Sequence, residues 1–408
     1  MPRYDVIVVG GGAAGLLCAG TAAARGRKVL VLEKMERPAR KILVTGKGRC
    51  NLTNNCTPEE LRAAVKANPR FLYSAFSVFS AQDTMNLFEQ LGVPLKTERG
   101  GRVFPVSDKA MDIADALVRY AKKSGAEIKR EEITALWIKE GSLHGVIAGK
   151  ERYAADNVVL ATGGKSYPGT GSTGDGYRFA AEAGHEIISP RPSLIPIETN
   201  ESWCADAMGL SLKNITLTVL QQGKKKPVFS SMGELLFTHF GVSGPLVLSA
   251  SAHMTAKPGD YKLLIDLKPA LAENELDARI LRDFEQYKNK YFRNALDDLL
   301  PRALIPVIIA NSGIAPEAKV HQITRAERQA LITAIKALTL TPKSFRPIEE
   351  AVVTAGGVKT LQVDPKTMQS KLMQGLFFAG ELLDVDAYTG GYNLQIAFST
   401  GYVAGMSV

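Results

Sequence analysis

The sequence predicts a mixed α/β protein built on a doubly wound parallel sheet, with other segments inserted into it. Over residues 1–190, short β-branched runs that end in glycine alternate with helical patterns, as they do in a doubly wound sheet. After Pro190 the chain alternates apolar and polar residues like antiparallel strands, and then changes to helical spacing. Beyond Pro347 a strand pattern returns, and we expect it to rejoin the first sheet.

The first fifty residues hold the strongest local pattern. Residues 4–9 form a β-branched run with the length of a buried parallel strand, and residues 10–15 (GGGAAG) follow with the spacing GxGxxG. Residues 16–25 are alanine-rich and helical, and residues 29–32 are a second buried strand, which Glu33 ends. A strand, glycine motif, helix, strand and acid in this order predict a dinucleotide site. The alternative is an accidental glycine-rich turn.

Each residue of this motif has its own role in holding a dinucleotide. Gly10 permits the tight turn, Gly12 lets the backbone approach the pyrophosphate, and Gly15 lets the helix approach the strand. The pyrophosphate then lies at the helix N-terminus, where N–H groups and the helix dipole favour an anion. The Glu33 carboxylate can accept hydrogen bonds from ribose hydroxyls. It would repel a 2′-phosphate, which disfavours NADP in this site.

Further strands that end in glycine follow later in the chain. Residues 158–164 (VVLATGG) and 375–381 (GLFFAGE) are short apolar strands, and residues 389–403 form a helix that opens with TGGYNLQ. Residues 113–123 are a helix with apolar residues at helical spacing. Residues 41–54 lack a helical pattern but are rich in backbone and amide donors, next to the predicted phosphate end of the site.

The middle of the chain has a different character. Residues 211–220 and 261–267 alternate like strands, and residues 224–227 (KKKP) form a polar turn between them. From residue 271 to about residue 340 the pattern is helical. An antiparallel β segment and a helical segment are therefore expected between the two ends.

Composition excludes several classes of protein. Of the 408 residues, 45% are apolar and 22% are charged, which excludes a disordered chain, a collagen-like fibre and a membrane bundle. The four cysteines are too few and too scattered for a disulfide framework, and they lack zinc-finger spacing. We therefore expect free thiols, no metal site and a cytoplasmic location.

The net charge of +9 comes largely from one stretch. Residues 25–49 hold nine Lys or Arg and two Glu, a net charge of +7. A positive field of this kind favours the phosphates of a cofactor, a nucleic acid or an anionic lipid. The alternative is a solvated basic face.

Motifs along nearly the whole chain carry a family resemblance. They are GGGAAG (10–15), RKILVTGKGRCNLTN (40–54), GRVFPVSDKA (101–110), ATGGKSYPGTGSTGDGY (161–177), GELLFTHFGVSGP (233–245), VTAGGV (353–358) and FFAGELLDVDAYTGGYNLQIAFSTG (377–401). With these motifs the chain resembles the two-dinucleotide-binding-domain flavoproteins. Within that group it is similar to the bacterial BaiN/RdsA-like (YhiN-like) three-domain flavoproteins.

The resemblance implies a Rossmann-like FAD-binding domain formed by both chain ends, residues 1–190 and 347–408. It also implies an inserted antiparallel β domain (191–268, with part of 320–346) and an inserted helical domain (269–340). FAD would be held non-covalently in an extended pose, and the helix that opens near Gly391 would stabilise negative charge on the reduced ring. The residues expected to hold FAD are Gly10, Gly12, Ala13, Ala14, Gly15, Glu33, Lys34, Lys41, Gly48, Arg49, Cys50, Asn51, Thr53, Ile133, Ala161, Thr162, Gly163, Gly380, Glu381, Gly391, Asn393, Leu394 and Gln395.

Two side chains are candidates for moving a proton. Cys50 should lie near the cofactor, where it could protonate a carbon opposite the hydride, or else act as a small buried thiol that packs against FAD. His239 lies in one of the family motifs and is either an acid–base group or a structural, hydrogen-bonded histidine.

Three further residues are candidates for contacting the substrate. Arg102 and Lys109 flank residues 104–105 (FP) and could clamp an anion, with a solvated turn as the alternative. Tyr388 could stack on flavin or substrate, although core packing would explain it equally well.

No second GxGxxG follows a strand downstream, so a dedicated nicotinamide domain is not expected. NAD(P)H would bind transiently over the flavin, or the electrons would come from the substrate itself. The resemblance implies one of three activities: reduction of uridine to dihydrouridine in ribosomal RNA, reduction of a bile-acid double bond, or oxidation of aminoacetone. The basic residues favour the RNA activity. A small-molecule flavoenzyme and an RNA-binding protein with structural FAD remain as alternatives.

Overall fold

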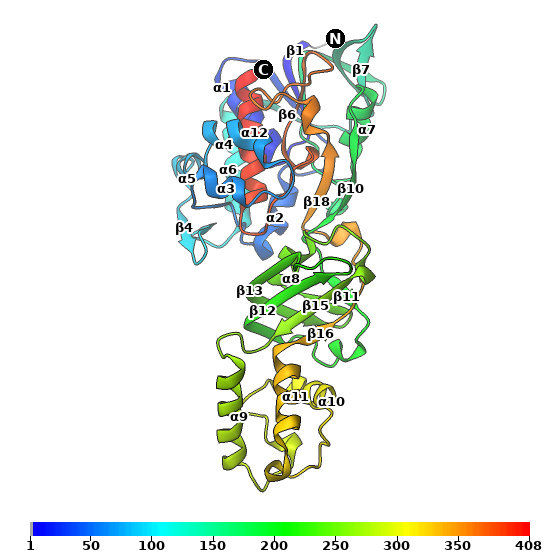
Figure 1. Cartoon of the computed structure of the whole chain (residues 1–408). Coiled ribbons are helices and arrows are strands. Elements are labelled where there is room, and N and C mark those ends of the chain that lie inside the picture. Colours follow the sequence, from blue (N-terminus) through cyan, green and yellow to red (C-terminus); the bar gives the residue numbers. More distant parts are fainter. Residues whose placement is uncertain (1–2) are drawn as a thin grey trace. The chain divides into compact units, whose positions relative to one another are not determined.

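The chain forms two units, and its two ends meet in the first of them. The computed structural model describes residues 3–408. Unit 1 comprises Met1–Ser193 and Pro347–Val408, and unit 2 comprises Leu194–Arg346 (Figure 1).

A seven-stranded sheet is the centre of unit 1. Its strands in spatial order are β6 (Glu127–Arg130), β2 (Val29–Glu33), β1 (Arg3–Val9), β9 (Glu151–Leu160), β8 (Ser142–Ala148) and β7 (Ala135–Lys139), with β19 (Leu376–Phe378) also paired to β9. Strands β6, β2, β1, β9 and β19 run parallel, while β8 and β7 extend the sheet in antiparallel fashion. This arrangement confirms the predicted α/β class and the use of both chain ends.

The prediction that the strand after Pro347 rejoins this sheet is wrong. Strand β18 (Val353–Val358) pairs antiparallel with β10 (Ile187–Ser193) in a separate two-stranded sheet. Gly357 of β18 has a positive φ, and a Cβ there would lie 2.4 Å from the Leu382 carbonyl oxygen. Glycine therefore lets β18 lie close to the segment that follows β19. The C-terminal segment reaches the main sheet through β19 instead.

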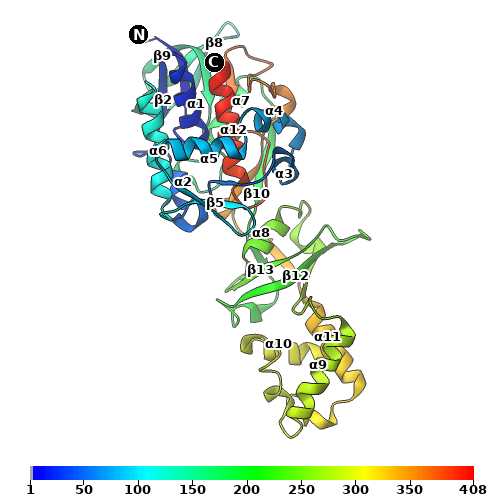
Figure 2. The ribbon, with the colours of Figure 1, turned by 90° about the vertical axis from the view of Figure 1, so that its left-hand side faces the viewer.

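Two helices from opposite ends of the chain lie side by side in unit 1. Helix α1 (Ala13–Ala24) follows β1, and α12 (Tyr392–Ser407) ends the chain; both views show them together (Figures 1 and 2). A Cβ on Gly401 would lie 2.4 Å from the Ala14 carbonyl oxygen, and one on Gly405 would lie 2.6 Å from the Cys18 carbonyl oxygen. The two glycines therefore permit this close helix–helix contact.

The remaining elements of unit 1 surround this pair and the sheet. They are the helices α2 (Arg40–Val44), α3 (Pro58–Ala63), α4 (Tyr73–Val78), α5 (Ala81–Gln90), α6 (Ala110–Lys123) and α7 (Asp175–Glu182), and a small sheet of β3 (Thr53–Asn54), β5 (Arg102–Pro105) and β4 (Leu95–Glu98). Helix α2 begins a stretch, residues 41–54, in which the sequence shows no helical pattern. It has only five residues, too few for a sequence periodicity to reveal it.

Unit 2 consists of an antiparallel sheet and four helices. Its strands in spatial order are β16 (Leu338–Leu340), β15 (Tyr261–Asp266), β12 (Ser211–Gln221), β13 (Phe229–Thr238), β14 (Gly241–Ser243), β11 (Ile197–Thr199) and β17 (Pro342–Phe345). Its helices are α8 (Pro245–Ser251), α9 (Glu273–Gln286), α10 (Ile305–Ser312) and α11 (Arg325–Lys336). The strands and the helices share one hydrophobic core, which includes Phe237 of the sheet and Phe292 of the helical segment. The expected division into two inserted domains stays a prediction.

Within residues 3–408, we find no helix with both the length and the apolar character that crossing a membrane requires.

The close contact between α1 and α12 predicts that Gly401→Ala destabilises the chain. The added methyl group would meet backbone atoms of Ala14 that cannot move without shifting α1. Overpacking of this kind costs about 1–3 kcal/mol, a fall in Tm of about 2–10 °C. Gly259→Ala is the matched control, because nothing lies within 4 Å of a Cβ there. Thermal unfolding of the two variants checks the prediction; equal Tm values would contradict it.

Candidate cofactor site

A deep cleft opens at the carboxyl ends of β1, β9 and β19, where ligands bind in sheets of this kind. The segments that follow these three strands all line it, namely residues 10–12, 161–163 and 379–381. The cleft contains about 1370 Å³ of empty space, including its open mouth. The lining extends from Glu33 past Gly12 to Asn393 and Leu394, as an elongated ligand such as a dinucleotide requires.

The turn from β1 into α1 fits a pyrophosphate. Gly10 has φ +102°, and a Cβ there would lie 2.6 Å from the Ala161 carbonyl oxygen; one on Gly15 would lie 1.9 Å from the Gly10 carbonyl oxygen. Gly12 differs from both, because a Cβ there would enter open space. Gly12 lines the cleft and is the N-cap of α1, and no side chain caps the helix. The helix N-terminus is therefore exposed to an anion in the cleft.

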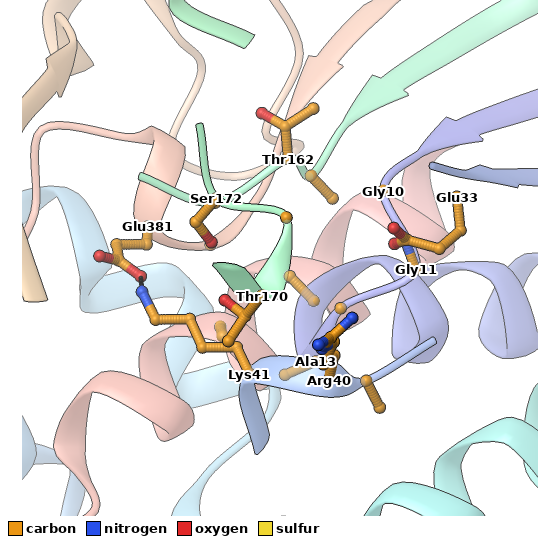
Figure 3. A pocket seen from close by; sticks show the side chains of 18 of the residues that line it. Gly10, Gly11, Ala13, Glu33, Arg40, Lys41, Thr162, Thr170, Ser172 and Glu381 are labelled. Atoms are coloured by element: carbon orange, nitrogen blue, oxygen red, sulfur yellow. Dashed lines mark hydrogen bonds and ion pairs between the residues drawn. The ribbon is translucent and has the colours of Figure 1, made fainter. Parts of the chain in front are cut away.

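Glu33 fixes the other side of this turn. One of its carboxylate oxygens accepts a hydrogen bond of 2.7 Å from the Gly11 N–H, and the other accepts one of 2.8 Å from the Met35 N–H. The carboxylate lines the cleft, and each of its oxygens retains a lone pair for a ribose hydroxyl. Figure 3 shows Glu33 next to Gly11.

A second helix N-terminus, that of α12, reaches the same cleft. Asn393 and Leu394 in its first turn line the cleft. Gly391 is the N-cap with φ +97°, and a Cβ there would lie 2.3 Å from the Thr53 carbonyl oxygen. The dipoles of α1 and α12 thus favour negative charge at two points of one cavity.

Lys41 and Glu381 form an ion pair in the cleft lining. The Lys41 Nζ lies 2.6 Å from Glu381 Oε2 (Figure 3). It also donates a 2.8 Å hydrogen bond to the Ser166 hydroxyl. Glu381 Oε1 accepts hydrogen bonds from the Ser166 hydroxyl (3.0 Å) and the Thr354 N–H (2.8 Å). This network ties helix α2 to the segment after β19.

The structure brings most of the predicted cofactor residues together. Fifteen of them line the cleft: Gly10, Gly12, Ala13, Ala14, Glu33, Lys34, Lys41, Ile133, Ala161, Thr162, Gly163, Gly380, Glu381, Asn393 and Leu394. Eight lie outside the lining: Gly15, Gly48, Arg49, Cys50, Asn51, Thr53, Gly391 and Gln395. Gly15 and Gly391 act by permitting close backbone contacts, as described above.

Arg49 is held away from the cleft by acids that are distant in sequence. Its guanidinium forms ion pairs with Glu98 and with Asp108, the latter at 2.6 Å, and lies over the Phe104 ring at 4.2 Å. The Asp108 carboxylate also pairs with Lys96 at 2.7 Å. The side-chain hydrogen bonds from Lys96 and Arg49 lower the pKa of Asp108, and this network occupies Arg49.

Cys50 is a fully buried thiol. Burial raises its pKa to about 12, and a hydrogen bond with Thr45 opposes that shift only in part. A buried neutral thiol of this kind packs as a small apolar group. Its role as a proton donor stays a prediction.

Gln395 is buried and all of its amide atoms are engaged. Its Oε1 accepts hydrogen bonds from the hydroxyls of Thr53 (2.6 Å) and Thr84 (2.8 Å), and its Nε2 donates to the Phe79 carbonyl (3.2 Å) and the Ser399 hydroxyl (3.0 Å). Gln395 therefore ties α12 to β3 and α5.

The four remaining predicted residues lie outside the cleft lining. His239 is an exposed residue of unit 2, between β13 and β14. Arg102 pairs with Glu98 at 3.7 Å, and Lys109 is exposed at the start of α6. The roles proposed for them from the sequence stay predictions. Tyr388 is half-buried, and its hydroxyl lies 3.3 Å from the Lys66 Nζ.

The structure adds lining residues that the sequence reasoning missed. Arg40 lines the cleft, is exposed, and has no carboxylate partner among residues 3–408, so it can face a phosphate. Thr170, Gly171 and Ser172 also line it. These three residues belong to the glycine-rich family motif of residues 161–177, which makes this stretch a candidate substrate or cofactor loop. Nothing in the sequence marked the apolar lining residues Phe179, Val352 and Val385.

Four of the nine cations in residues 25–49 pair with carboxylates of unit 1, and a fifth, Arg25, bonds to carbonyls. Arg25 donates to the carbonyls of Gly405 (3.0 Å) and Val408 (3.1 Å) at the C-terminus of α12. The other engaged cations are Lys34 with Asp175, Arg37 with Asp115, Lys41 with Glu381, and Arg49 with Glu98 and Asp108. The stretch therefore presents less free charge than its composition indicates, although Arg40 in the cleft lining remains unpaired with any carboxylate of residues 3–408.

Among residues 3–408 there is no group of three or more His, Cys, Asp or Glu side chains that could hold a metal ion.

The fold is shared with the solved structure of a dehydrogenase. The structure of 3-ketosteroid-delta4-(5alpha)-dehydrogenase from Rhodococcus jostii RHA1 superposes with a TM-score of 0.55 and 16% sequence identity, over 100% of this chain and 96% of that one. At this identity the likeness concerns the fold.

Two proteins of known activity are similar over their full length. The ribosomal RNA dihydrouridine synthase of Escherichia coli K12 and the 3-dehydro-bile acid delta(4,6)-reductase of Clostridium scindens are each 31% identical over 407 residues, which are 98% of this chain and 97% of each relative. Together with the dinucleotide cleft, these likenesses define an FAD-dependent oxidoreductase. The match to the HI0933-like protein Rossmann domain covers residues 4–407, so the chain belongs to the HI0933-like family.

Gly12 and Gly15 differ in their surroundings, so substituting each of them tests whether the cleft binds FAD. Gly12→Ala places a methyl group in the open space of the cleft, so we expect an unchanged Tm of the FAD-free protein but FAD binding at least about tenfold weaker, about 1.4 kcal/mol. Gly15→Ala meets the Gly10 carbonyl, so we expect a lower Tm. Flavin absorbance per chain and thermal unfolding measure the two effects. Normal FAD binding by Gly12→Ala would contradict this site.

Proposed function

We propose that the protein uses FAD and NAD(P)H to reduce a carbon–carbon double bond, and that its substrate is a uridine of ribosomal RNA in the cytoplasm. The observation that carries the proposal is likeness over the full length to a ribosomal RNA dihydrouridine synthase, together with a complete dinucleotide cleft. The net charge of +9 also favours a polyanionic substrate.

The residues of the cleft suit each part of FAD. The N-terminus of α1 and the Arg40 guanidinium would face the pyrophosphate, and Glu33 would bind the adenosine ribose. The N-terminus of α12 would lie at the flavin end, where it favours negative charge on the ring. Bound there, FAD supplies the hydride chemistry.

Reduction of a double bond also needs a proton donor, and Tyr388 with Lys66 suits this role. The segments that carry them are paired: the Lys66 N–H donates to the Asp386 carbonyl (2.7 Å), and the Tyr388 N–H donates to the Ala64 carbonyl (3.1 Å). The amide of Asn393, which lines the cleft, donates to the Tyr388 carbonyl at 3.2 Å. The Lys66 Nζ lies 3.3 Å from the Tyr388 hydroxyl.

The electrostatics of this pair support proton transfer. Burial raises the pKa of Tyr388, so its hydroxyl carries a proton at neutral pH. Burial lowers the pKa of Lys66, although the Asp386 carboxylate opposes that shift. A lysine with a lowered pKa gives up a proton more readily, so it can stabilise and then reprotonate the phenolate that forms. Perturbed groups gathered in this way are common at active sites.

A second candidate function is reduction of a small-molecule enone. It is favoured by one observation: the bile-acid reductase is as similar as the RNA enzyme, at 31% identity over 98% of the chain. The two functions share the cofactor and the chemistry and differ in the substrate.

Nucleoside mass spectrometry of ribosomal RNA tests the proposal. We expect dihydrouridine in the parent strain, its loss on deletion of the gene, and its return with the wild-type gene. Dihydrouridine that persists unchanged in the deletion strain would overturn the RNA proposal and favour the enone.

The assignment of Tyr388 predicts a selective defect. In Tyr388→Phe we expect normal reduction of the flavin by NAD(P)H, but transfer to the substrate about 10²–10⁴-fold slower, the usual contribution of a general acid. Tyr73→Phe is the matched control, because Tyr73 is an exposed tyrosine of the same unit. Stopped-flow absorbance separates the two half-reactions; a wild-type rate of substrate reduction in Tyr388→Phe would remove it from the mechanism.

A further inference from the structure

A rigid ledge of tyrosines and cations lies in the helical part of unit 2. We define the tyrosine–lysine ledge as Tyr287, Lys290, Tyr291, Arg293 and Lys319. Its residues come from two segments, 287–293 and 316–320, that backbone hydrogen bonds join. The Phe292 N–H donates to the Ala318 carbonyl (2.9 Å), Arg293 to Pro316 (3.1 Å) and Val320 to Lys290 (3.2 Å).

Buried anchors hold the ledge in place. Phe292 and Val320, which alternate with ledge residues, lie in the core of unit 2 at 0% and 2% exposure. The side chains next to them point outward, and Tyr291 is 41% exposed. The ledge is thus a preformed surface.

Each tyrosine ring of the ledge carries a cation. The Lys290 Nζ lies 3.9 Å from the centre of the Tyr287 ring, and the Lys319 Nζ lies 3.9 Å from the centre of the Tyr291 ring. Within residues 3–408, neither lysine has a carboxylate partner, whereas Arg293 pairs with Glu317 at 3.2 Å. The two lysines therefore keep their charge available for an anion.

An apolar groove adjoins the ledge and shares Arg293 with it. Ile305, Ile309 and Ile314 line the groove, and Arg293 and Arg302 also belong to its wall. Asp297 is the acid of this wall and lies 3.7 Å from Arg302. The groove holds about 1250 Å³ of empty space, including its open side, which leaves room for flat apolar groups between cations.

The sequence around the ledge favours one kind of ligand. Residues 286–296 contain three cations and no acid; the acids that adjoin the ledge are Asp298, which accepts a hydrogen bond from the Tyr287 hydroxyl, and Glu317, which pairs with Arg293. Cations that alternate with exposed aromatic rings suit a strand in which phosphates alternate with flat bases, because the rings stack on bases and the lysines meet phosphates. A lipid surface or an acidic protein would also engage the charges, but neither alternates phosphates with flat bases as a single strand of RNA does.

We propose that the tyrosine–lysine ledge and its groove bind single-stranded RNA. This inference rests on the proposed RNA function and assigns its substrate contact to unit 2. In the complex, Tyr291 stacks on a base, Lys290 and Lys319 contact phosphates, and the groove takes an unstacked base.

Fluorescence anisotropy with a labelled uridine-rich single-stranded RNA tests the ledge in the full-length FAD-loaded protein. We expect the double variant Lys290→Ala with Lys319→Ala to bind at least about tenfold more weakly. We also expect the slope of log K against log salt to fall by about 1.4, because each phosphate contact contributes about 0.7. Tyr291→Ala should weaken binding about tenfold without changing the slope.

Lys213→Ala with Lys257→Ala is the matched control, because it removes two exposed lysines of the same unit that lie outside the ledge. If the ledge variant and the control variant bind RNA with the same affinity, the proposal is overturned. If the wild-type protein bound polyglutamate as tightly as it binds RNA, the proposal would also be overturned, because the ledge would then be a surface for acidic proteins.

The experiments distinguish failure of the RNA-binding proposal for the ledge from failure of the proposed enzymatic activity. RNA binding that depends on the ledge, with dihydrouridine unchanged by gene deletion, would keep the ledge and reject the reaction. Dihydrouridine made at the wild-type level by the ledge variants would reject the ledge and keep the reaction.

Discussion

The contact between α1 and α12 is the constraint on which the rest of unit 1 depends. It joins helices from the two ends of the chain, and it exists because Gly401 and Gly405 leave room for the backbone of α1 at Ala14 and Cys18. Both helices begin at the cleft, so their contact sets the two positively polarised N-termini in one cavity. The ends of the chain must therefore fold together before the cofactor site is complete.

The sequence predicted the parts of the site whose chemistry is local. The strand, glycine turn, helix and acid of residues 4–33 are positioned by neighbours in sequence, and Gly10, Gly12 and Glu33 lie where the pattern predicts. The short strand 376–378 was equally readable, since a buried apolar run that ends in glycine needs no distant partner to be recognised.

What could not be predicted depends on partners far along the chain. From its own segment Arg49 is predicted to bind a phosphate, but in the structure it forms ion pairs with Glu98 and Asp108. The same holds for the basic stretch 25–49, whose charge is met by acids and carbonyls from distant elements. These pairs weaken the charge argument for RNA in unit 1 and give weight to Lys290 and Lys319 of unit 2, which have no carboxylate partner among residues 3–408.

The most direct test of the account is to ask which substrate reoxidises the reduced protein. The FAD-loaded chain is reduced anaerobically with NADPH and mixed in parallel with a ribosomal RNA fragment and with a steroid enone, while flavin absorbance and products are followed. The account predicts that RNA restores the oxidised flavin and yields one dihydrouridine per flavin. Flavin that stays reduced with RNA and is reoxidised by the enone would contradict it.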